Sequence, residues 1–76
     1  MNKSLKNWKS KEIVSFLLKN GFLEIKKKKK GDHRCLFKKQ TEAYTEIDMG
    51  RKSFAAREML TISKQSKIPR AFWKKV

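Results

Sequence analysis

The sequence predicts an α+β fold of one small domain, in which two helices and three antiparallel strands follow one another in the order α-β-β-β-α. Apolar residues recur at helical spacing over residues 10–20 and again over residues 53–62. Between these two segments, apolar and polar residues alternate with a period of two, as they do in strands. A chain of 76 residues fits one domain. Such a domain buries about 60% of the surface that its unfolded chain exposes.

The first helix is expected to begin at Ser10, a favourable N-cap residue, and to end before Gly21. Gly21 suits the left-handed C′ position of a Schellman motif, which places Phe22 at C″, where it packs on Leu17. Residues 1–9 form a lead-in, with Trp8 as a candidate to pack on the helix. The helical stripe consists of Ile13, Phe16, Leu17 and Asn20.

Two strands are expected next, joined by a run of five lysines and a glycine turn. Over residues 22–26 apolar and polar residues alternate, which predicts a half-buried strand. The second strand covers residues 33–39. Its inward face is open between two alternatives, because Leu36 lies on one face while Cys35 and Phe37 lie on the other.

The third strand covers residues 44–49 and has a clear alternation. Thr45 and Ile47 lie on one face, and Glu46 and Asp48 lie on the other. We expect these two carboxylates to lie opposite lysines of the neighbouring strand, where each such pair contributes roughly 0.2–1 kcal/mol.

The second helix is expected to begin with Ser53 as its N-cap and to stop at Ile68-Pro69. A short helical turn over residues 69–76 follows. The domain therefore covers residues 10–68, between the lead-in and this turn. The apolar stripe of the second helix consists of Ala55, Ala56, Met59, Leu60 and Ile62.

The charge of the chain indicates a polyanionic or acidic partner. Lysine and arginine number 21 against 7 acidic residues, a formal net charge of +14. Residues 26–39 carry seven lysines and Arg34 against Asp32, which is half of that net charge in one hairpin. Such a surface attracts nucleic acid, an anionic membrane or an acidic protein, and RNA is the first expectation.

Composition excludes several other classes. The longest apolar run, residues 13–18, is too short to cross a bilayer, and no signal-peptide pattern opens the chain, so we expect a cytoplasmic protein with no membrane partner. The single cysteine, Cys35, excludes an internal disulfide and is expected to be a packing residue. One cysteine and one histidine cannot form a structural zinc site, so we expect no metal and no cofactor.

His33 is the candidate catalytic residue. It is the only histidine, it follows the lysine run after Gly31 and Asp32, and imidazole is the side chain that exchanges protons near neutral pH. Lys30 and Arg34, with Lys28 as a weaker third, are the candidates to hold a scissile phosphate. The alternative is a solvated basic hairpin with a surface histidine, whose lysines serve solubility.

A second phosphate contact is predicted at the turn of residues 50–53, where Arg51 and Lys52 precede a helix N-terminus. Unpaired N–H groups and the helix dipole favour an anion at such a place. The alternative is that Ser53 is a simple N-cap preceded by two exposed cations.

Other polar and aromatic side chains have plainer interpretations. Glu46 and Asp48 share a strand face, but no further ligand completes a metal site, so charge balance explains them. Phe37 and Trp73 are expected in the core. Tyr44 lies on the polar face of its strand, where its ring is available to stack on an RNA base.

The order of elements is the layout of double-stranded RNA-binding domains, with a three-stranded antiparallel sheet and both helices on one face. Over residues 10–68 the sequence also resembles the HicA, or YcfA-like, toxin family. The motifs that carry this resemblance are Ser10-Lys11-Glu12-Ile13, Leu17-Leu18-Lys19-Asn20-Gly21-Phe22, Lys30-Gly31-Asp32-His33 and Ile62-Ser63-Lys64-Gln65-Ser66-Lys67-Ile68.

The resemblance implies a toxin of a toxin-antitoxin pair, a metal-independent endoribonuclease that cleaves mRNA and is silenced by an acidic HicB-like antitoxin. The family's catalytic histidine falls on His33. The chain departs from the family pattern in two segments: Asp32 stands where serine is usual, and Ser66-Lys67 replaces Ala-Gly, so the second helix lacks its glycine stop. Asp32 places a carboxylate beside the catalytic position.

Two further functions stay open from the sequence. A non-catalytic RNA-binding module of the same fold needs only the lysine run and makes His33 incidental. A small DNA-binding or membrane-surface protein is the third alternative. The clustering of cations in a hairpin, and not along one helix face, disfavours the membrane surface.

Overall fold

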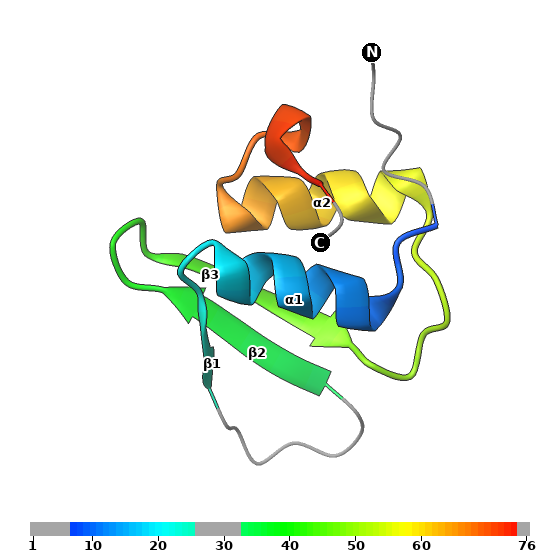
Figure 1. The fold of residues 1–76 in the computed structure, drawn as a ribbon, viewed down its shortest axis with the longest axis horizontal. Helices are drawn as coiled ribbons and strands as arrows, with labels where there is room; N and C mark the ends of the chain where they lie inside the picture. Colours follow the sequence, from blue (N-terminus) through cyan, green and yellow to red (C-terminus); the bar gives the residue numbers. More distant parts are fainter. Residues whose placement is uncertain (1–6, 26–32, 75–76) are drawn as a thin grey trace.

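The computed structural model describes residues 7–25 and 33–74, and it has the predicted order of elements (Figure 1). The lysine run lies outside these ranges. Both helices lie on one side of a three-stranded antiparallel sheet with the order β1-β2-β3. The elements are α1 (Ser10–Lys19), β1 (Leu23–Ile25), β2 (His33–Lys38), β3 (Ala43–Asp48), α2 (Ala56–Ser66) and the 3-10 turn η1 (Arg70–Phe72).

The strand register divides the sheet into two faces. Leu36 pairs with Thr45, and both are almost fully buried beneath the helices. The Thr45 hydroxyl also donates to Gln65 Oε1 of α2 at 2.8 Å, which identifies this as the helix-covered face. The alternation predicted for β3 is therefore confirmed, and β2 places Leu36 inward. Phe37 consequently points away from the helices and is only half-buried, so its predicted place in the core is wrong.

We call the opposite side of the sheet the open face. It consists of Leu23, Ile25, His33, Cys35, Phe37, Tyr44, Glu46 and Asp48, which the register places together. The half-burial predicted for β1 is wrong, because Leu23 and Ile25 belong to this face and are 71% and 37% exposed. Phe22, one residue before β1, takes the core position instead.

The ends of α1 follow from local chemistry. The N-cap lies one residue earlier than predicted. It is Lys9, whose backbone N–H donates to Glu12 Oε1 at 2.8 Å. Ser10 is the first helical residue, because the Glu12 carboxylate supplies the cap. The C-terminus is the predicted Schellman motif, with Gly21 at φ 93° and the Phe22 N–H donating to Leu17 O at 3.0 Å.

Helix α2 begins later than predicted. Ser53 is exposed and is not its N-cap, which is Ala55. Phe54 is buried and forms a β-bridge with Trp8, so the chain stays extended until Phe54 is in the core. The buried positions of α2 are Met59, Ile62, Ser63 and Ser66, whereas the predicted stripe residue Leu60 is 37% exposed.

The segments on either side of residues 10–68 complete the core. Trp8 and Trp73 are both buried and lie edge to face, with ring centroids 5.3 Å apart. Phe16 of α1 stacks on Trp73 at 4.3 Å. In place of the usual glycine stop, Lys67 adopts the left-handed conformation, and its Nζ donates to Thr41 O at 2.7 Å. This contact ties the end of α2 to the β2–β3 turn and offsets the steric cost of the left-handed residue.

Candidate active site

His33 is the first residue of β2, at the end of the sheet where β3 finishes. Its side chain is exposed and belongs to the open face, and its cross-strand neighbour is Asp48, the last residue of β3. The sheet therefore presents the imidazole to solvent from a strand end, beside a carboxylate that the chain brings from 15 residues away.

The acidic residues of β3 are placed differently from the prediction. Glu46 lies opposite Cys35, and Asp48 lies opposite His33, so neither pairs with a lysine of β2. The buried Cys35 thiol and the Tyr44 hydroxyl each lie 3.4 Å from Glu46 Oε2, as weak donors to it. These contacts hold the Glu46 carboxylate against the sheet, one row away from His33.

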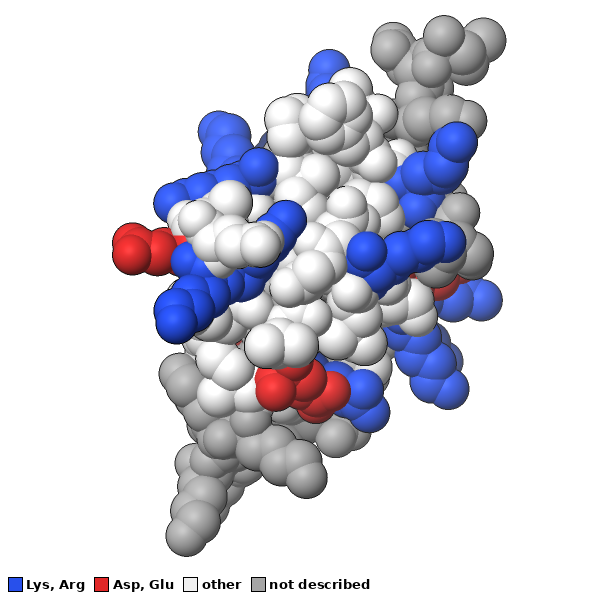
Figure 2. Space-filling model, turned by 60° about the vertical axis from the view of Figure 1, so that its left-hand side comes forward, with Lys and Arg blue, Asp and Glu red and all other residues white. Residues whose placement is uncertain are grey.

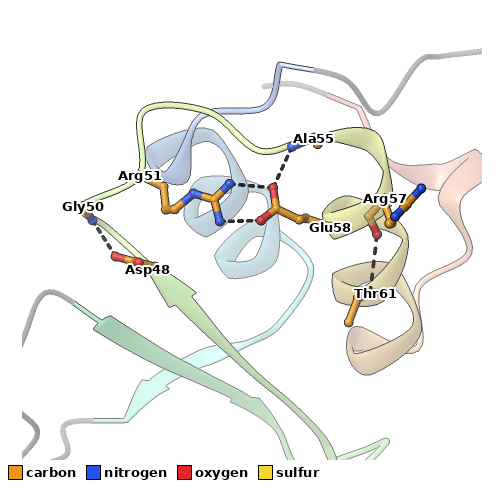
Figure 3. Close-up of polar contacts among 7 residues, drawn as sticks. All are labelled: Asp48, Gly50, Arg51, Ala55, Arg57, Glu58 and Thr61. Carbon is orange, nitrogen blue, oxygen red and sulfur yellow. Dashed lines mark hydrogen bonds and ion pairs between the residues drawn. The ribbon is translucent and has the colours of Figure 1, made fainter.

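Asp48 is fixed by its own turn. Its Oδ1 accepts a hydrogen bond of 2.9 Å from the Gly50 N–H, as in an Asx turn (Figure 3). A Cβ atom on Gly50 would come within 3.3 Å of the same oxygen, so the absence of a side chain there permits the close approach. The carboxylate beside His33 is thereby held in one orientation.

Arg34 does not share the side of the sheet that carries His33. Adjacent residues of a strand point to opposite faces, and Arg34 Nη1 lies 3.5 Å from Glu24 Oε1, its neighbour on β1. About half of the Arg34 side chain is exposed. The guanidinium is therefore engaged by a weak surface ion pair, which a phosphate has to compete with.

Arg51 is bound by Glu58 in a bidentate pair, shown in Figure 3. The hydrogen bond between Arg51 Nη2 and Glu58 Oε1 is 2.6 Å, and the same oxygen accepts the Ala55 N–H at 2.9 Å. The bond from Arg51, followed by that from Ala55, lowers the pKa of Glu58, while the bond to Glu58 raises the pKa of Arg51. The Arg51 guanidinium also lies 5.0 Å from the centre of the Phe54 ring.

The anion predicted at the start of α2 is thus supplied by the chain itself. The Glu58 carboxylate occupies the position at the helix N-terminus where a phosphate was expected. Sequence reasoning missed this role, although a glutamate three residues after the N-cap is a recognisable capping signal. Lys52 is exposed in the same turn.

The remaining candidates, Lys28 and Lys30, and the departure at Asp32 lie outside the described residues. Beyond the lysine run, basic side chains are spread over the described surface. Figure 2 shows Lys and Arg on both sides of a central strip of uncharged residues, with acidic side chains at few places. The positive field is therefore a property of the whole domain as well as of one hairpin.

Comparison with known proteins adds no relative. No family model, no curated protein and no solved structure matches this chain. Among the described residues, no helix is long and apolar enough to cross a membrane.

Proposed function

We propose that this protein is an RNA-cleaving toxin of the HicA type, a metal-independent endoribonuclease that acts on mRNA in the cytoplasm. The observation that carries the proposal is the position of His33, exposed at the start of β2 in a chain of net charge +14. The motifs shared with the HicA family support the same function, and the fold agrees in its coarse α-β-β-β-α order.

The chemistry needs few groups, because RNA carries its own nucleophile in the 2′-hydroxyl. His33 removes that proton or protonates the leaving 5′-oxygen, which is worth about 10²–10⁴ in rate. We assign to Asp48, its cross-strand neighbour, the role of orienting the imidazole during the transfer. Cations stabilise the extra negative charge on phosphorus.

In this proposal, lysines make most of the contacts with the RNA phosphates. Lys28 and Lys30 keep their predicted role as phosphate contacts, and so does Lys52, which is exposed in the turn after β3. Arg34 and Arg51 bind phosphate only after exchanging their glutamate partners, Glu24 and Glu58, for the RNA. They therefore contribute less to affinity than their charge alone indicates.

An acidic HicB-like antitoxin is the proposed protein partner. A surface of this charge favours fast, electrostatically steered capture by a protein of opposite charge. A short acidic reading frame beside the gene for this chain is the expected genomic observation, and its co-expression is expected to relieve growth arrest.

The test replaces His33 with alanine and, in a second variant, with glutamine, which keeps a polar side chain without proton exchange. Both variants are expected to lose cleavage by about 10²–10⁴ or more, because the proton transfers are removed. RNA affinity stays nearly unchanged, because the lysines remain. Single-turnover cleavage of a labelled RNA in the presence of a chelator, run beside a filter-binding isotherm, measures both quantities.

Gln40→Ala, a change at an exposed position of the β2–β3 turn, serves as the matched control and should cleave like the natural protein. Undiminished cleavage by His33→Ala would remove His33 from the mechanism. Tight RNA binding by the natural protein without any cleavage would leave a non-catalytic RNA-binding module as its function.

A further inference from the structure

The open face carries a row of apolar side chains for which the proposed chemistry has no use. The register places Leu23, Phe37 and Tyr44 opposite one another on the three strands, in a single row across the sheet. Leu23 is 71% exposed and Tyr44 is 37% exposed, while Phe37 is half-buried between them. Single exposed apolar residues need no explanation, but three aligned in one row across the sheet do.

Packing of the domain does not account for this row. The helices cover the other side of the sheet, where Leu36, Thr45 and Ile47 are almost fully buried. Directly opposed side chains of antiparallel strands have Cβ atoms about 4.5–5.5 Å apart, so the Phe37 and Tyr44 rings are neighbours on an accessible surface. Aromatic side chains on an antiparallel sheet are a platform on which unpaired bases stack.

Charge favours a polyanion over a second copy of the chain as the partner of this row. Two copies of a chain of net charge +14 repel each other, whereas a single-stranded RNA is attracted to it. Glu46 borders the row on one side and repels phosphates locally. The stacked nucleotides of an RNA strand on this face therefore turn their bases toward the row and keep their phosphates away from Glu46.

The Tyr44 ring is held ready for such a contact. Its hydroxyl lies 3.4 Å from Glu46 Oε2, which also accepts from the Cys35 thiol at 3.4 Å. The Glu46 carboxylate thus links Cys35 and Tyr44 on the open face and restrains the Tyr44 ring through its hydroxyl group. A pre-oriented ring loses less conformational entropy when a base stacks on it.

We propose that Phe37 and Tyr44 stack unpaired bases of the RNA that the protein binds. This inference rests on the proposed function and specifies its substrate as single-stranded RNA. Phe37 follows His33 on the same strand and the same face at a separation of about 13 Å, from a strand rise of roughly 3.3 Å per residue. The stacked bases thus belong to nucleotides close to, but distinct from, the one that is cleaved.

The test compares three 2′-O-methyl oligonucleotides of equal length, which lack the nucleophile and so are not cleaved: a single-stranded one, its duplex and an abasic one. Tyr44→Leu keeps an apolar side chain but cannot stack. It is expected to weaken binding of the single strand by about 5- to 150-fold and to leave the duplex and the abasic strand unchanged. Tyr44→Phe keeps the ring and loses only the contact of its hydroxyl with Glu46, so it should retain most of the affinity for the single strand.

Phe72→Ala removes an exposed aromatic ring away from the sheet and is the matched control, with no expected change. A loss with Phe72→Ala alone, or an equal loss for all three ligands with Tyr44→Leu, overturns the inference. An unchanged affinity in Tyr44→Leu also overturns it while leaving RNA cleavage intact. A natural protein that elutes as a dimer, with a monomeric Tyr44→Leu variant, identifies a copy–copy interface instead. Failure of the natural protein to bind any of the three refutes the proposed function itself.

Discussion

The two faces of the sheet are built from alternate residues of the same strands, yet they differ in almost every physical respect. On the helix-covered face, Leu36, Thr45 and Ile47 are nearly inaccessible and make contacts that hold the domain together. On the open face, His33 and Tyr44 are accessible. A period of two therefore lets one short segment serve stability with one half of its side chains and chemistry with the other.

The helix layer and the open face also differ in the partners of their charged side chains. Arg51 and Glu58 bind each other at the start of α2, within the helix layer, and the cap at Ala55 depends on the same carboxylate. On the open face, Glu46 Oε2 accepts from the thiol of Cys35 and the hydroxyl of Tyr44. Changes to the helix layer should thus alter folding, and changes to the open face should alter function.

The largest expected effect on stability separates two leucines of the sheet. Leu36→Ala leaves a cavity beneath the helices and is expected to cost about 2–5 kcal/mol of unfolding free energy. Leu23→Ala removes an exposed side chain of the open face and should change that free energy by less than about 0.5 kcal/mol. Urea unfolding of both variants, with unchanged m-values, measures the difference. Equal losses would mean that the open face is covered in solution.

A smaller effect separates two hydroxyl groups of adjacent residues. Thr45→Val removes the buried donor to Gln65 and is expected to cost about 0.5–1.5 kcal/mol. Tyr44→Phe removes a partly exposed donor to Glu46 and should cost less than about 0.5 kcal/mol. Thermal melts of the two variants compare them. A double-mutant cycle of Thr45→Val with Gln65→Ala tests whether the buried bond is the cause.

The contribution of the helix layer to folding stability should also depend on pH. Because the pKa of Glu58 is lowered in the folded protein, its ion pair stabilises the fold at neutral pH and loses this effect as the pH falls through that lowered pKa. Glu58→Gln, which keeps an acceptor for the Ala55 N–H, should be less stable than the natural protein at pH 7. The difference should shrink below about pH 4.

Arg51→Gln removes the other half of the pair and is the reciprocal control for this measurement. It should reproduce most of the loss at pH 7, and Glu58→Gln added to it should cost only the smaller part that comes from the charged cap on the Ala55 N–H. A stability difference that stays constant from pH 7 to pH 3 would show that the charge of Glu58 does not matter to folding.

Much of the fold could be predicted from local patterns. The order of elements, the Schellman end of α1 at Gly21 and the inward face of β3 are visible in the spacing of glycine and apolar residues. The start of α2 could not be predicted in this way. Phe54 pairs with Trp8, a residue from the other end of the chain, and this contact delays the helix past Ser53.

The candidate site likewise has features that the sequence predicts and features that only the folded chain shows. The sequence by itself determined that the only histidine follows a dense run of cations, since both facts are matters of composition and order. Only the tertiary structure decided the neighbours: Asp48 beside His33, Glu24 on Arg34 and Glu58 on Arg51. Pairing of this kind depends on strand register and on the turn that leads into α2. These are set by which apolar side chains reach the shared core, and no local spacing encodes that choice.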